Sequence, residues 1–173
     1  MVSLGRGIKP DFQFLSVTDL DADWLRARRL GGLLLDMDNT LTPWNAPAAP
    51  AATLAWGEKL RAGGIRTCIV SNSRKQAKVE RVAAALAMPY VYRAGKPRRG
   101  GFEAGRRILG LAPEEILVVG DQLFTDVFGG NRARMRTCLI CPISPTEFIG
   151  TKILRLLERA AGRPACFQEP GGK

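Results

Sequence analysis

The chain has 173 residues, of which 46% are hydrophobic and 24% charged, and this indicates one globular domain with its own core. Histidine is absent, which excludes Ser-His-Asp and Cys-His catalysis and histidine metal sites. With 26 Lys and Arg against 16 Asp and Glu, the formal charge of +10 favours an anionic partner: a phosphorylated substrate, a phospholipid headgroup or a nucleic acid.

Periodicity predicts strands that alternate with helices. Residues 1–31 form a lead-in, within which 21–30 is expected to be a short helix capped by Asp19 or Asp21. Strands are predicted at 32–37, 65–71, 89–92, 115–120 and 136–140. Helices are predicted at about 50–62, 74–87, 99–110 and 124–134. This order indicates an α/β fold with a parallel five-stranded sheet, whose ligands bind at the carboxyl ends of the strands.

The insertions between these elements are short. Residues 43–52 are rich in alanine and proline and suit a loop, and 72–95 have room for one helix and one short strand. We therefore expect one domain over 1–173 without a large cap, an open site, and a flexible tail at 163–173. No apolar run is long enough to span a bilayer and no secretory signal is visible, so the expected location is cytoplasmic.

Two carboxylates follow the first predicted core strand. Asp36 and Asp38 stand directly after the apolar run 32–35. Like charges this close repel, and a divalent cation with a preference for oxygen ligands, such as Mg²⁺, would relieve the repulsion. An Asp-rich turn without any function is the alternative for this pair in isolation.

Polar residues also follow three later apolar runs, in a fixed order. Ser71 and Asn72 come first, then Lys96 in a Gly-Lys-Pro turn, and then Asp121 with Asp126. Each has a structural alternative, since Ser71 could cap a helix, Lys96 could be a solvated turn residue and Asp121 could cap the next helix. Together they are expected to converge at one edge of the sheet, which is typical of an active site.

These motifs resemble a known superfamily. The segments Asp36–Leu41, Ser71–Ser73, Gly95–Pro97 and Gly120–Arg132 resemble those of the haloacid dehalogenase (HAD) superfamily, subfamily IIIA, and within it the YqeG family, which is related to phosphatidylglycerophosphate phosphatases. The resemblance covers residues 10–145 and implies a Rossmann-like HAD fold and a Mg²⁺-dependent phosphatase.

The resemblance also implies roles for single residues. Asp36 would be the nucleophile that forms an aspartyl-phosphate, and Asp38 the general acid and then the general base. Lys96 would neutralise Asp36 and the phosphate. The substrate would be contacted by Thr40, which also orients Asp38, and by Ser71, Asn72 and Lys96. The metal ligands would be Asp36, the backbone carbonyl of Asp38, Asp121 and Asp126.

The substrate and the partner stay open at this point. The resemblance implies phosphatidylglycerophosphate, while soluble nucleotides, sugar phosphates and nucleic-acid ends are alternatives. A basic RNA-associated binding protein on a phosphatase scaffold is an alternative of another class, but no RNA-binding motif is present and aromatic residues make up only 7%.

Two further features are less specific. Cys138 and Cys141 form a Cys-x-x-Cys pair without the second pair that a zinc site requires, and Cys68 and Cys138 lie in apolar runs that predict buried thiols. Residues 149–160 show a helical pattern with a basic face. This face, formed by Lys152, Arg155 and Arg159, could dock on an anionic membrane or belong to a helix packed on the sheet.

Overall fold

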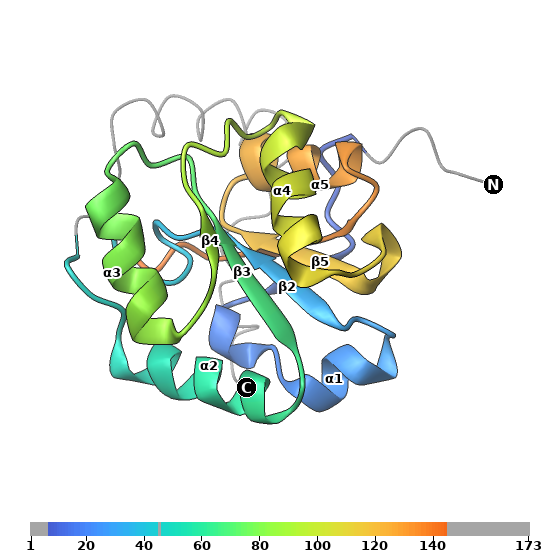
Figure 1. Ribbon diagram of the computed structural model, residues 1–173. Coiled ribbons are helices and arrows are strands. Elements are labelled where there is room, and N and C mark those ends of the chain that lie inside the picture. The colour runs from blue at the N-terminus through green and yellow to red at the C-terminus, as the bar shows by residue number, and fades with distance from the viewer. Residues whose placement is uncertain (1–6, 45, 145–173) are drawn as a thin grey trace, which may run out of the picture.

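The computed structural model describes residues 7–44 and 46–144, and its centre is one parallel β-sheet (Figure 1). Six strands are hydrogen-bonded in the order β1-β6-β5-β2-β3-β4. Their bounds are β1 Phe12–Phe14, β2 Gly32–Leu35, β3 Arg66–Val70, β4 Tyr90–Val91, β5 Ile116–Gly120 and β6 Arg136–Ile140. The predicted α/β class and parallel sheet are confirmed, whereas the prediction of five strands is wrong because the sheet has six.

The additional strand is β1, which lies in the segment taken from the sequence as a lead-in. It has three residues and pairs in parallel with the end of β6. The rings of Phe12 and Phe14 both pack edge-on against Trp24, with centroids 5.0 and 5.1 Å apart. A strand this short carries too little alternation to be recognised, and it is held by side chains that come from the following helix.

Helices cover both faces of the sheet, and α1 begins as predicted. The helices are α1 Ala22–Ala27, α2 Ala51–Ala62, α3 Gln76–Leu86, α4 Arg99–Leu109 and α5 Phe128–Arg132. The carboxylate of Asp21 caps α1 by accepting a hydrogen bond from the Trp24 amide at 2.6 Å. The helix predicted over 124–134 is instead a π-helical turn, Leu123–Val127, that continues into the short α5.

The hydrophobic core has two layers, one on each side of the sheet. Leu33 and Leu35 of β2 belong to the cluster that includes buried residues of α1, α2 and α3. Leu34, between them, belongs to the cluster formed with α4. Alternate residues of a strand point to opposite faces, so β2 is buried on both sides, as its uninterrupted apolar run predicts.

Within the described residues, no helix is long and apolar enough to cross a membrane. The predicted helical pattern at 149–160, with its basic face, lies outside the residues that the structure describes.

Candidate active site

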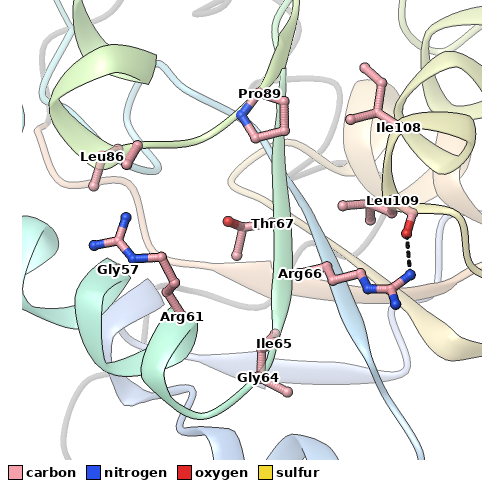
Figure 2. A pocket seen from close by; sticks show the side chains of 11 residues that line it. Gly57, Arg61, Gly64, Ile65, Arg66, Thr67, Leu86, Pro89, Ile108 and Leu109 are labelled. Atoms are coloured by element: carbon pink, nitrogen blue, oxygen red, sulfur yellow. Dashed lines mark hydrogen bonds between the residues drawn. The ribbon is translucent and has the colours of Figure 1, made fainter.

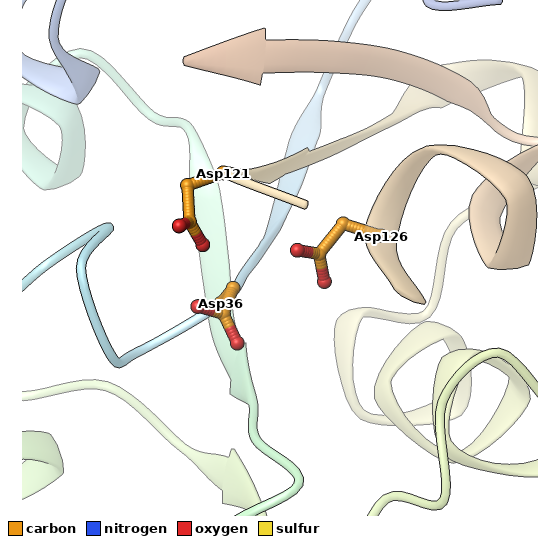
Figure 3. Close-up of side chains that lie close together, drawn as sticks. All are labelled: Asp36, Asp121 and Asp126. Atoms are coloured by element: carbon orange, nitrogen blue, oxygen red, sulfur yellow. The ribbon is translucent and has the colours of Figure 1, made fainter. Parts of the chain in front are cut away.

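The predicted site residues meet at the carboxyl edge of the sheet. Asp36 follows β2, Ser71 follows β3 and Asp121 follows β5, and these three strands are neighbours. The carboxylates of Asp36, Asp121 and Asp126 point toward one another in Figure 3, and each offers an oxygen within 4.8 Å of the others. The convergence expected from the order of the motifs is therefore present in the fold.

Asp126 reaches this cluster because of the π-helical turn after β5. One of its carboxylate oxygens, Oδ2, accepts a hydrogen bond from the Gln122 amide at 3.2 Å. A Cβ at Gly120 would lie 2.3 Å from the same oxygen, so a side chain at position 120 would collide with the carboxylate. The glycine that ends β5 thus makes room for Asp126.

Lys96 places one positive charge among these carboxylates. Its Nζ donates hydrogen bonds to Oδ1 of Asp36 at 2.6 Å and to Oδ1 of Asp126 at 2.7 Å. Burial alone would lower the pKa of Lys96, but the charges of Asp126 and Asp36 raise it, so the amine is a cation at neutral pH. Burial, together with the charge of Asp36, raises the pKa of Asp126 to about 6 even though Lys96 lowers it. One lysine does not compensate three carboxylates.

The loop that carries Lys96 is fixed by contacts with its backbone. The side chain of Asn72 accepts a hydrogen bond from the Lys96 amide at 2.8 Å and donates one to the Lys96 carbonyl at 3.1 Å. On the other side, a Cβ at Gly101 would lie 2.5 Å from the carbonyl oxygen of Ala94, so α4 approaches the loop closely. In this arrangement Asn72 positions the lysine, while its contact with a phosphoryl group stays a prediction.

Asp38 lies apart from the carboxylate cluster. Its Oδ1 accepts a hydrogen bond from Nζ of Lys78, on α3, at 2.5 Å. Burial raises the pKa of Asp38, and the hydrogen bond from Lys78 opposes this shift. A carboxyl group with a raised pKa is suited to donate a proton. That the Asp38 backbone carbonyl ligates a metal stays a prediction.

Lys78 is a site residue that the sequence interpretation missed. It is separated from Asp38 by 40 positions, and it belongs to a helix whose other polar side chains are mostly exposed. Its residue type alone does not distinguish it from a surface lysine. A possible signal is its place near the start of the helix after Ser71, because that end of the helix lies at the carboxyl edge of the sheet.

Ser71 and Thr40 are buried beside these groups. The hydroxyl of Ser71, whose residue is 1% exposed, accepts a hydrogen bond from the Ser73 amide at 3.1 Å. The hydroxyl of Thr40 is buried and has no hydrogen-bond partner among the described residues. Both positions suit a contact with a substrate or with Asp38, and their predicted roles stay predictions.

The donor set fits Mg²⁺. Asp36, Asp121 and Asp126 supply hard carboxylate oxygens, and Oδ2 of Asp36 is buried and accepts no hydrogen bond from the described part of the chain. A divalent cation would balance the excess negative charge of the cluster. These three residues would hold the ion, which would supply electrostatic stabilisation to a phosphoryl group.

A pocket of about 420 Å³ lies at the opposite edge of the sheet, where β3 begins (Figure 2). Its lining is mostly apolar and includes Leu86, Pro89 and Ile108. The guanidinium of Arg66 there donates a hydrogen bond to the Leu109 carbonyl at 2.7 Å. None of the predicted site residues lines this pocket.

No disulfide joins the cysteines of the described residues, and Cys68 and Cys138 are buried as predicted. Burial raises the pKa of Cys68 to about 12, and it also raises the pKa of Cys138. Such thiols are poor nucleophiles and poor metal ligands at neutral pH.

Comparisons with known proteins show the family and the fold of the chain. A family model described as HAD-hydrolase-like matches residues 93–141, which include Lys96, Asp121 and Asp126. An uncharacterised protein from Listeria monocytogenes serotype 4b shares the fold, with a TM-score of 0.54 and 17% identity over 75% of this chain and 99% of that one. The family model and the sequence relatives described next define the chain as a HAD-like phosphatase.

Sequence relatives narrow this class. The probable phosphatase YqeG of Bacillus subtilis is 34% identical over 150 residues, which are 87% of both chains. Within the HAD-like phosphatases, the chain belongs to the YqeG family. The chloroplastic phosphatidylglycerophosphate phosphatase 1 of Chlamydomonas reinhardtii is 31% identical over 79% of this chain, and the match spans 55% of that relative's length.

Proposed function

We propose that the protein is a Mg²⁺-dependent phosphomonoester hydrolase that works through an aspartyl-phosphate on Asp36. The observation that carries this proposal is the position of Asp36 at the end of β2, where it accepts a hydrogen bond from Lys96 and lies beside the carboxylates of Asp121 and Asp126. A carboxylate can attack phosphorus only where the negative charge of the phosphoryl oxygens is neutralised. Lys96 supplies part of that neutralisation, and a metal held by Asp36, Asp121 and Asp126 would supply the rest.

The reaction then has two steps. A carboxylate oxygen of Asp36 attacks the phosphorus, the bond to the leaving oxygen breaks, and Asp38 gives its proton to the departing alcohol. In the second step Asp38 takes a proton from a water molecule that attacks the same phosphorus, which releases inorganic phosphate and the Asp36 carboxylate. The raised pKa of Asp38 and its position outside the carboxylate cluster support this division of roles.

For the substrate, we propose phosphatidylglycerophosphate, which would be converted to phosphatidylglycerol. The Chlamydomonas relative bears the name of that activity. The formal charge of +10 would favour approach to an anionic membrane. The segment between β2 and α4 contains no separate cap domain in its described residues, so a headgroup at a membrane surface could reach Asp36. Phosphatases for soluble nucleotides, sugar phosphates or nucleic-acid ends are the competing proposals.

The test compares substrates at equal phosphomonoester concentration. Phosphate release from phosphatidylglycerophosphate in anionic vesicles is expected to exceed release from sugar phosphates, nucleotides and 5′-phosphorylated oligonucleotides. Chelation by EDTA should stop all of these reactions, and added Mg²⁺ should restore them. Equal turnover of sugar phosphates, with no binding to vesicles at low salt, would contradict the lipid substrate and leave the phosphatase chemistry in place.

A separate variant tests the proposed contact with the membrane. Charge reversal at Lys152, Arg155 and Arg159 is expected to weaken vesicle binding while the turnover of an aryl phosphate in solution is retained. Vesicle binding that is unaffected by these changes would place the contact elsewhere on the basic surface.

A further inference from the structure

A pocket of about 610 Å³ adjoins the active site. The positively charged side chains that line it have no role in the reaction described above. It is lined by Asn72, Arg74, Arg93 and Gly95. Arg93 and Gly95 belong to the loop that carries Lys96, and the Asn72 side chain binds the Lys96 backbone. The pocket therefore lies directly next to the residue that neutralises the nucleophile.

The two loops that form this pocket are tied together. The Ala94 amide donates to the Ser71 carbonyl at 3.0 Å, and the Arg93 amide donates to the Ser73 carbonyl at 3.2 Å. With the two bonds of the Asn72 side chain, four hydrogen bonds connect the loop after β3 to the loop after β4. The backbone positions from which the two arginines extend are thus fixed relative to Lys96.

Neither arginine has a structural task in the described residues. Both are exposed, and no carboxylate of the described chain forms an ion pair with Arg74 or Arg93. By contrast, Arg106 binds Glu103, and Arg66 binds the end of α4. Arg93 also has a left-handed backbone (φ 48°), which a residue with a Cβ adopts at a cost in free energy. Two free guanidinium groups beside one pocket favour an anionic ligand.

The residues at the reacting phosphoryl group are buried, whereas the two arginines are exposed, so the anionic ligand of the arginines is a different group. Lys96 is 7% exposed and Ser71 1% exposed, so the group that they contact is enclosed. The arginines lie on the open side of the same loops and would meet the part of the substrate that extends outward. That part is the leaving group.

We propose that Arg74 and Arg93 select phosphomonoesters whose leaving group carries a second phosphate in diester linkage. This inference rests on the proposed phosphatase function and assigns specificity to two residues outside the catalytic set. A guanidinium binds a phosphate through two parallel hydrogen bonds, and a hydrogen bond to a charged group contributes about 1.5–3 kcal/mol, which corresponds to about a tenfold to hundredfold effect.

The experiment uses a matched pair of soluble substrates. Glycerol 1-phosphate has the phosphomonoester alone, and glycerophosphoglycerophosphate, the deacylated headgroup, adds the diester phosphate. The wild-type protein with Mg²⁺ should show a higher kcat/KM for the second compound, mainly through KM. Arg74→Gln and Arg93→Gln should each reduce the ratio of the two kcat/KM values by about tenfold or more. Arg107→Gln, an exposed arginine on α4, is the control and should keep the wild-type ratio.

A second arm separates the diester phosphate from the membrane as the source of the effect. Phosphatidylglycerophosphate in neutral detergent micelles should show the same loss in both variants. A loss seen only with anionic vesicles, or an unchanged ratio for the soluble pair, would overturn the assignment of the two arginines. A wild-type protein that hydrolyses no phosphomonoester with Mg²⁺ would contradict the proposed function itself, which is a separate result.

Discussion

At both edges of the sheet a cationic side chain donates hydrogen bonds to oxygen atoms. The two edges differ in net charge, because the acceptor is neutral at one edge and the acceptors are carboxylates at the other. At the amino edge, Arg66 donates to the neutral Leu109 carbonyl at the end of α4, where the helix dipole favours a positive charge. At the carboxyl edge, Lys96 faces ionisable carboxylates that outnumber it. The first arrangement is complete within the protein. The second is left with excess negative charge, which a bound cation would balance.

Removal of the cation at the carboxyl edge should have the larger effect. Lys96→Met leaves Asp36 and Asp126 close together without their shared partner, and it removes a charge from the phosphoryl site. We expect kcat for an aryl phosphate to fall by about 10²–10³-fold, the range typical of a lost electrostatic contact in an active site. Lys59→Met, on the exposed side of α2, is the matched control. A loss below about tenfold in a folded variant would be incompatible with the role given to Lys96.

The excess of negative charge at the carboxyl edge should also make the stabilisation of the protein by Mg²⁺ depend on pH. The pKa of Asp126 is raised to about 6, so the folded metal-free protein holds this proton more tightly than the unfolded chain does. The contribution of Asp126 to the stability of the metal-free protein should therefore fall as the pH rises from the ordinary aspartate value of 3.8 through 6. Mg²⁺ held by the cluster would compete with this proton and would oppose the loss above that interval.

Thermal unfolding with and without Mg²⁺ measures this effect. The same Mg²⁺ concentration, about 100 times the Kd at pH 7.5, is used at both pH values. Near pH 7.5 this concentration should stabilise the folded protein by about 2.7 kcal/mol and raise Tm, and near pH 5 the rise in Tm should be much smaller. Asp126→Asn should reduce both the rise in Tm and its pH dependence. An equal rise at both pH values would show that the ion binds elsewhere.

A change at the amino edge should have the smallest effect. Arg66→Gln removes the hydrogen bond to the end of α4 and is expected to lower the free energy of unfolding by about 1 kcal/mol, measured with urea. Turnover of an aryl phosphate should stay within about twofold of the wild type, since the change lies at the far edge of the sheet. A large loss of activity in the folded variant would remove the contrast between the two edges.

Much of the fold and of the site follows from local patterns. The apolar runs before Asp36, Ser71 and Asp121 predict strands, and their parallel arrangement brings the following residues to one edge. The tertiary details do not follow. Strand β1 depends on packing against Trp24, and the pairing of Asp38 with Lys78 depends on where α3 begins. The Asn72 contact with the Lys96 backbone joins residues 24 positions apart, for which the sequence has no signal.

The central claim is that Asp36 is the nucleophile, and Asp36→Asn tests it most directly. The substitution keeps the size of the side chain and removes its negative charge. We predict that turnover of an aryl phosphate with saturating Mg²⁺ falls by roughly 10⁴-fold or more while the circular dichroism spectrum is retained. We also predict that a rapid acid quench of the wild-type reaction yields a phosphorylated peptide containing Asp36, detected by mass spectrometry. Near wild-type turnover by a folded Asp36→Asn variant would contradict the account.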